Sequence, residues 1–164
     1  MIVLGVDPGI SNLGLAVVEG DAKRARLSYA GAVTTRPQEP APLRAGRLFE
    51  AVEALIQAHG PEAVAIEAQY FYRQNERAFQ VGWGFGAVLI AAHRAGLAVF
   101  AYGPMQVKKA LVGHGRADKA QVAFMVRALL NLKAPLTPSH AADAAALALT
   151  HLAMPAPARQ DYRI

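Results

Sequence analysis

Two short apolar runs that each end in a carboxylate constrain this chain more than any other feature. Ile2–Val6 leads directly into Asp7, and Ala63–Ile66 leads directly into Glu67. Acidic residues are rare in such runs unless they pair with another group or hold a cation. If the two runs are neighbouring strands, both carboxylates lie in the crevice beyond the strand ends, where open α/β sheets bind ligands.

A late segment can add two more polar groups to the same place. His140 and Asp143 are three residues apart in the alanine-rich run Pro138–Leu152, which we expect to be a helix. Residues at this spacing share one helical face, and small neighbours let a helix lie close to a sheet. Four oxygen- or nitrogen-bearing side chains from three elements therefore predict a divalent-metal site.

The expected elements follow the order of an α/β domain. Residues 1–154 are predicted to form a five-stranded mixed sheet flanked by helices, and residues 155–164 a short, frayed C-terminal tail. Short connections between the first three strands predict an antiparallel meander, and Asp118 and Thr137 are expected helix N-caps. The predicted strands are Ile2–Val6, Leu13–Glu19, Leu27–Thr34, Ala63–Ala68 and Leu97–Tyr102, and the predicted helices are Leu43–His59, Glu76–Ala95, Asp118–Leu130 and Pro138–Leu152.

Charge and composition narrow the class of partner. Lys and Arg together number 17 against 12 acidic residues in 164, a net charge of +5 that favours a polyanion such as a nucleic acid. There is no cysteine, which excludes disulfides and thiolate metal sites. The longest apolar stretch, Val81–Ala92, is interrupted by glycine and too short to span a bilayer, so we expect a cytoplasmic protein with no membrane partner.

An ordered set of motifs resembles one known family. They are Gly5-Val6-Asp7-Pro8-Gly9 followed by Gly14, Ala65-Ile66-Glu67, Gln106–Gly113, Lys119–Val126, and Ala142-Asp143-Ala144-Ala145 followed by Thr150-His151. Together they resemble RuvC, the bacterial Holliday junction resolvases, over nearly the whole chain. The resemblance implies a ribonuclease-H-like fold, a homodimer, two divalent cations per subunit (Mg²⁺ or Mn²⁺), and symmetric nicking of four-way DNA junctions in recombination and repair. A branch-migration motor complex is an implied partner.

By this resemblance Asp7, Glu67 and Asp143 fall on the family's catalytic acids, and His140 falls on a fourth position that is most often Asp. Two cations about 3.5–4 Å apart can clamp the attacking and leaving oxygens of a phosphoryl displacement. Imidazole suits transition metals better than Mg²⁺, so His140 favours Mn²⁺ and makes activity sensitive to pH. His140 as a proton carrier rather than a ligand remains the alternative.

Basic and aromatic residues complete the predicted DNA site. Tyr70, Phe71, Tyr72 and Arg73 follow Glu67 closely, and an aromatic ring here can stack on an unpaired base at the crossover. Tyr70 or Phe71 matches the family's important aromatic, and packing of either ring in the core is the alternative. The predicted phosphate contacts are Lys108 and Lys119, which match family lysines near the active site, and Lys109 and Arg116, for which an exposed surface role is equally expected.

The helix Glu76–Ala95 carries apolar residues around more than one face, interleaved with glycine. Such a surface suits a second helix at close range, and the family dimerises through this region. Burial of the same side chains in the monomer core is the competing interpretation. The apolar residues are Phe79, Trp83, Phe85, Val88, Leu89 and Ile90, and the glycines are Gly82, Gly84 and Gly86.

Three other functions fit parts of the pattern. A YqgF-like RNA-processing nuclease shares the strand–Asp–x–Gly start, but the Lys108 and Lys119 segments argue against it. A nucleotide-binding module of the actin and sugar-kinase superfamily also begins this way, although such chains are usually longer. A catalytically silent junction-binding protein is possible because His140 departs from the usual acid.

Overall fold

The computed structural model describes residues 1–68 and 76–164, with no side chains described for residues 76–80. Its strands are β1 (Ile2–Asp7), β2 (Asn12–Gly20), β3 (Ala25–Thr34), β4 (Ala63–Glu67) and β5 (Ala98–Tyr102). Its helices are α1 (Ala41–His59), α2 (Glu76–Arg94), α3 (Pro104–Val112), α4 (Lys119–Leu129), α5 (Ser139–Ala153) and α6 (Ala156–Arg159), followed by the 3₁₀ turn η1 (Gln160–Tyr162).

The five strands form one mixed sheet in the order β3-β2-β1-β4-β5, as predicted. The first three strands pair antiparallel, whereas β4 pairs parallel with both β1 and β5. Val6 is the partner of Ile66 across β1 and β4, so the next residues, Asp7 and Glu67, leave the sheet at the same edge. The predicted adjacency of the two carboxylate-ending strands is confirmed.

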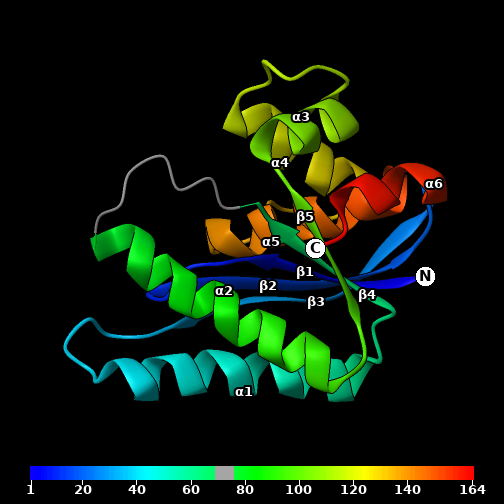
Figure 1. Cartoon of the computed structure of the whole chain (residues 1–164). Coiled ribbons are helices and arrows are strands. Elements are labelled where there is room, and N and C mark those ends of the chain that lie inside the picture. The colour runs from blue at the N-terminus through cyan, green and yellow to red at the C-terminus, as the bar shows by residue number, and fades with distance from the viewer. Residues whose placement is uncertain (69–75) are drawn as a thin grey trace.

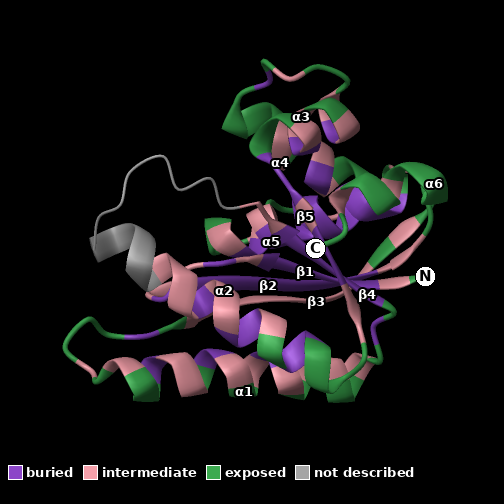
Figure 2. Ribbon diagram, viewed as in Figure 1, coloured by how far each residue is buried: buried purple, intermediate pink, exposed green. Residues whose placement is uncertain are grey.

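Helices cover both faces of the sheet (Figure 1). Helices α1 and α2 pack side by side on one face, and α5 lies across β1 and β2 on the other. Alternate residues of β1 pack against the helices on opposite faces of the sheet, because successive side chains of a strand point to opposite faces. Val3 packs with the α5 side, while Leu4 and Val6 pack with the α1 and α2 side, and the buried residues concentrate in the sheet between them (Figure 2).

Two glycines let α5 lie directly on the sheet. A Cβ at Gly5 of β1 would lie 2.0 Å from the Ala144 carbonyl oxygen, and one at Gly14 of β2 would lie 2.0 Å from the His140 carbonyl oxygen. No other residue type fits at these positions unless the helix moves away. The glycines therefore set the distance between the strand end at Asp7 and the first turn of α5.

The helix predictions hold with two exceptions. Asp118 caps α4 through a capping box with Gln121, as expected. Thr137 does not cap the last helix, because α5 begins at Ser139 with no side-chain cap. Helix α3 was not predicted from the sequence; it has 9 residues and begins after Gly103 without a side-chain cap, so it carries little start signal.

The expectation of a frayed tail is wrong for most of residues 155–164. The tail folds into α6 and η1 and then reaches the free edge of β5, where Arg163 bridges to Phe100 and the Ile164 N–H donates to the Val99 carbonyl at 3.1 Å. The Tyr162 ring lies 5.0 Å from the Tyr102 ring, centroid to centroid. Strand-edge hydrogen bonds and aromatic packing thus hold a segment whose composition alone suggests disorder.

Candidate active site

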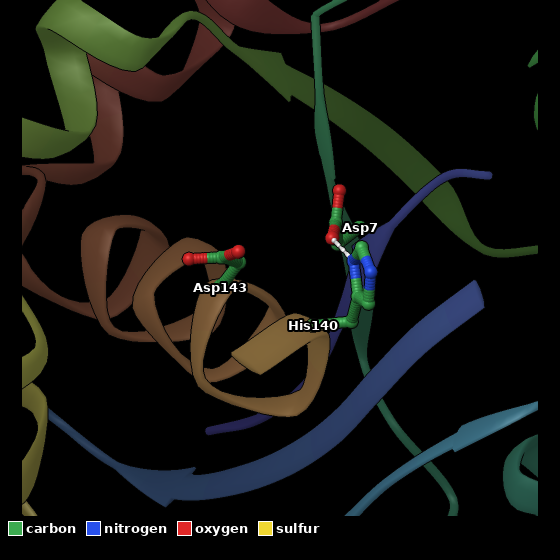
Figure 3. Close-up of side chains that lie close together, drawn as sticks. All are labelled: Asp7, His140 and Asp143. Carbon is green, nitrogen blue, oxygen red and sulfur yellow. Dashed lines mark hydrogen bonds and ion pairs between the residues drawn. The ribbon is translucent and has the colours of Figure 1, made fainter. Parts of the chain in front are cut away.

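Asp7, His140 and Asp143 come together at the edge of the sheet (Figure 3). Asp7 ends β1, and the other two side chains project from the first turns of α5. One potential ligand atom from each lies within 4.8 Å of the other two, and His140 Nδ1 lies 2.7 Å from Asp7 Oδ2. Residues far apart in the sequence thus form one cluster of two carboxylates and an imidazole.

Glu67 and two lysines share a cavity with this cluster. The cavity has a volume of about 240 Å³, and its polar lining consists of Asp7, Glu67, Lys108, Lys119 and Asp143. Lys119, the first residue of α4, places its Nζ 2.9 Å from Asp143 Oδ2. Each residue that the sequence analysis assigned to catalysis therefore lies in or beside one cavity, where acids and cations meet.

The charges of the site perturb one another. Burial raises the pKa of the Asp7 carboxyl above its ordinary value, the hydrogen bond with His140 opposes this rise, and the negative charge of Asp143 adds to it. The hydrogen bond to Asp143 raises the pKa of Lys119. Two ionised carboxylates at short range repel each other. A cation between them removes this repulsion and stabilises their ionised forms.

The donor set fits a divalent cation. Carboxylate oxygens are preferred by Mg²⁺ and Mn²⁺, and the single imidazole shifts the preference toward a transition metal. The Asp7 carboxylate, when ionised, can only accept a hydrogen bond, so Nδ1 of His140 carries the proton in that pairing. In that tautomer the lone pair of the imidazole is on Nε2.

The remaining predicted DNA residues lie elsewhere. Lys109, near the end of α3, and Arg116, in the following loop, are both exposed and do not line the cavity. Tyr70, Phe71, Tyr72 and Arg73 lie outside the described residues.

A set of buried hydrogen bonds to the turn after Asp7 was not predicted from the sequence. Arg44 is buried in α1 and bonds to Thr35 and Ser11, and Ser11 belongs to the turn after Asp7. A signal was present, because Arg44, Leu48 and Val52 recur every fourth residue and share the buried face of α1. An arginine at the spacing of an apolar stripe is expected to be buried with it, and a buried guanidinium needs hydrogen-bond acceptors around it.

A five-stranded mixed sheet with acids and lysines around one cavity at its carboxyl edge defines a ribonuclease-H-like nuclease. Comparison with known proteins supports this class. The family model described as crossover junction endodeoxyribonuclease RuvC matches residues 3–151. The chain belongs to the RuvC family.

Individual relatives agree along almost the whole chain. A crossover junction endodeoxyribonuclease RuvC of Thermus thermophilus is 56% identical over 154 residues, covering 92% of this chain and 93% of the relative. That of Rubrobacter xylanophilus is 45% identical over 150 residues, covering 92% of this chain and 84% of the relative.

Solved structures agree in fold. Thermus thermophilus RuvC in complex with a Holliday junction substrate superposes with a TM-score of 0.91 at 54% identity, covering 99% of this chain and 98% of that one. The yeast mitochondrial Holliday junction resolvase Ydc2, at 13% identity and a TM-score of 0.65, shares the fold over 92% of this chain and 78% of its own. The predicted ribonuclease-H-like class is confirmed.

Proposed function

We propose that this protein resolves Holliday junctions by metal-dependent hydrolysis of DNA phosphodiester bonds, with Asp7, Glu67, His140 and Asp143 holding two divalent cations. The observation that carries the proposal is the convergence of Asp7, His140 and Asp143 within 4.8 Å at the edge of a cavity that also contains Glu67. Membership of the RuvC family and the junction complex of the Thermus thermophilus relative supply the substrate. The alternatives of RNA processing and nucleotide binding have no comparable support.

The chain's own residues divide the work. Divalent cations bound here would polarise the scissile phosphate and activate a water molecule. Hydrolysis of the phosphodiester bond would then yield one end with a 5′-phosphate and one with a 3′-hydroxyl. Asp7, Glu67 and Asp143 supply the negative charge that retains cations, while Lys108 and Lys119 offer positive charge to the phosphate in the same cavity. His140 contributes a nitrogen ligand, which favours Mn²⁺ over Mg²⁺.

The proposed DNA surface extends beyond the cavity. The Tyr70–Arg73 segment follows Glu67 in the chain, and we assign it to the junction crossover, where its aromatic rings can stack on unpaired bases. Lys109, in α3, and Arg116, in the loop after α3, are both exposed and are assigned to flanking phosphates. Because counterions are released from each contacted phosphate, junction binding should weaken steeply with salt.

A homodimer is part of the same proposal. An apolar groove of about 690 Å³ runs between α1 and α2, and its lining includes Phe49, Trp83 and Ile90. Ile90 in this lining is 58% exposed, a large apolar side chain that a second copy of the chain would cover. A second copy of the chain on this groove would place two active sites about a two-fold axis, matching the symmetry of a four-way junction.

The wider setting follows from the proposed activity. Residues 1–154 form the nuclease unit, DNA in the cytoplasm is the substrate, and a branch-migration motor complex is the expected partner. No helix in residues 1–68 and 76–164 is long and apolar enough to cross a membrane.

A cleavage assay on a labelled synthetic four-way junction tests the function. We expect paired nicks across the junction in Mn²⁺ and slower nicking in Mg²⁺, with activity abolished in Asp7→Asn. Asp161→Asn, which removes an exposed acid in η1, is the matched control and should cut normally. Equal cleavage of a linear duplex or of structured RNA, or full activity of Asp7→Asn, would overturn the proposal.

A further inference from the structure

The turn that follows Asp7 joins the end of β1, at the edge of the sheet where the site lies, to the start of β2. Residues 8–11 connect β1, which ends at Asp7, to β2, which begins at Asn12. The turn is tight, because a Cβ at Gly9 would lie 2.5 Å from the Asn12 carbonyl oxygen. A group that restrains this turn also restrains the backbone on the C-terminal side of Asp7.

Arg44 restrains the turn from α1. Its Nε donates to Thr35 Oγ1 at 2.9 Å and its Nη2 donates to Ser11 Oγ at 2.9 Å. Thr35 in turn bonds to the turn backbone. Its Oγ1 donates to the Ile10 carbonyl at 2.6 Å, and its backbone N–H donates to the Ser11 carbonyl at 3.0 Å. Two consecutive residues of the turn are thereby tied to a helix on the opposite face of the sheet from α5.

The charge of Arg44 is unusual for its place. The residue is 3% exposed, and among the described residues no carboxylate lies within ion-pair distance of its guanidinium. A buried charge without a counter-charge is destabilising, and an aliphatic side chain would fill the stripe formed with Leu48 and Val52. Unlike an aliphatic side chain, the planar guanidinium offers several N–H hydrogen-bond donors in a rigid, forked arrangement.

Helix α2 restrains the same turn from another direction. At Gly84 an added Cβ would lie 3.3 Å from the Gly9 carbonyl carbon and 3.4 Å from the Ile10 nitrogen, so the helix backbone packs on the turn. Ile10 itself is 4% exposed and belongs to the core cluster beneath α1 and α2. The turn is thus held between two helices, with Arg44 supplying the polar part of the restraint.

We propose that Arg44 is a positioning residue that fixes the Asp7 carboxylate for metal binding, by locking the Ile10–Ser11 backbone through Thr35 and Ser11. The proposal rests on the proposed function, because it takes Asp7 to be a metal ligand. Arg44 has no hydrogen bond or ion pair with Asp7 among the described contacts, so its effect passes through the turn. Groups that hydrogen-bond directly to metal ligands are typically worth about tenfold to a hundredfold in metal affinity, and an effect passed through a turn should lie at the lower end of that range.

Direct titration of Mn²⁺ into the full-length protein without DNA, followed by calorimetry and by electron paramagnetic resonance of free Mn²⁺, tests the role. Arg44→Met should weaken Mn²⁺ binding by about tenfold, the lower end of the range for groups that orient metal ligands. Arg44→Lys, which keeps the charge but loses the fork, should fall between Arg44→Met and wild type. Arg47→Met is the matched control, one helical turn along, since Arg47 pairs with Glu39 at the surface and should leave Mn²⁺ affinity unchanged.

Two milder variants guard against a folding defect in Arg44→Met. Thr35→Val removes the hydroxyl that links Arg44 to Ile10, and Ser11→Ala removes the second acceptor, so each should weaken Mn²⁺ binding while circular dichroism stays native. If folded Arg44→Met, or both milder variants, bind Mn²⁺ as wild type does, the positioning role is wrong. Asp7→Asn separates the metal-site proposal from the Arg44 proposal. If Asp7→Asn also binds Mn²⁺ as wild type does, the metal site itself is misassigned. If Asp7→Asn loses Mn²⁺ binding while the Arg44, Thr35 and Ser11 variants keep it, only the role of Arg44 is wrong.

Discussion

Nδ1 of His140 lies 2.7 Å from Oδ2 of Asp7, although 133 positions separate the two residues in the chain. The contact exists because Gly14 allows the first turn of α5 to touch β2, while the pairing of β1 with β2 places Asp7 opposite Gly14. A strand end and a helix start, each unremarkable alone, thereby form a polar site. The same contact makes His140 the residue whose substitution is most informative.

Replacing His140 by Asp should change the metal preference. A fourth carboxylate suits Mg²⁺, so the ratio of cleavage rates in Mn²⁺ and Mg²⁺ should fall by about tenfold. His140→Ala should instead raise the concentration of either metal needed for half-maximal cleavage by about tenfold to a hundredfold. Initial rates on a four-way junction across a metal titration measure both effects. An unchanged rate ratio in His140→Asp would favour a proton-carrying role for His140.

Lys119→Met should separate metal binding from cleavage. The Lys119 ammonium lies 2.9 Å from Asp143 and places positive charge next to a carboxylate that a cation would use. Its removal should therefore tighten Mn²⁺ binding severalfold while slowing cleavage by about a hundredfold, because the phosphate loses a positive partner. Calorimetry and single-turnover cleavage test the two halves. Lys133→Met, at an exposed position, is the control, and a parallel loss of both properties would contradict the assignment.

Gly14→Ala should damage the site through the backbone. The new methyl group would lie 2.0 Å from the His140 carbonyl oxygen, so α5 has to move away from β2 and carry His140 and Asp143 with it. We expect a loss of stability of about 1–3 kcal/mol and a loss of Mn²⁺ binding larger than that stability change explains. Gly31→Ala is the control, since its methyl group meets the Tyr29 hydroxyl, the free end of a side chain. Equal behaviour of the two variants in Mn²⁺ titrations would sink this explanation.

Ile90→Glu tests the proposed dimer. Ile90 lines the groove between α1 and α2 and is 58% exposed, so a charge there should leave the isolated subunit folded. If a second copy covers the groove, the dissociation constant should rise by at least about thirtyfold, the effect expected at a central interface residue. Sedimentation velocity measures this, with Phe124→Glu as the control because Phe124 is 59% exposed on α4, away from the groove. A wild-type protein that is monomeric at micromolar concentration would remove the premise.

The sequence predicted what depends on local pattern and strand order. Apolar runs that end in Asp7 and Glu67 were enough to predict neighbouring strands and one site, since register follows from burial. The His140 and Asp143 spacing was enough to place both on one helical face. These features need only the periodicity of strands and helices.

Features that depend on tertiary contact were not predicted. Helix α3 has no side-chain cap, and the tail at Tyr162 and Arg163 is ordered only because β5 offers a free edge and the Tyr102 ring. The bonds of Arg44 to Ser11 and Thr35 join segments that no local pattern relates. The two glycines at the α5 contact were visible as motif residues, but their steric purpose required the helix to be in place.

The stability of the fold should fall on mild acidification because of His151. This residue is fully buried in α5, with Nδ1 2.8 Å from the Tyr102 hydroxyl, and no group in the described part of the chain bonds to its Nε2 atom. Burial lowers the pKa of His151 to about 4, against 6.5 for an ordinary imidazole, so the unfolded chain binds more protons between these values. Stability is therefore fully present above pH 6.5 and declines as the pH falls toward 4.

The predicted loss is roughly 3 kcal/mol across that range, the free energy that corresponds to the difference between the folded and unfolded pKa of the imidazole. Urea unfolding of the metal-free protein from pH 7.5 to 4.5 measures the slope. His151→Gln cannot titrate, so its stability should be lower at pH 7.5 but should change less with pH than that of wild type. His114→Gln, in the exposed loop after α3, should keep the wild-type slope. If His151→Gln retains the full slope, groups other than His151 must carry the acid sensitivity, and this explanation is wrong.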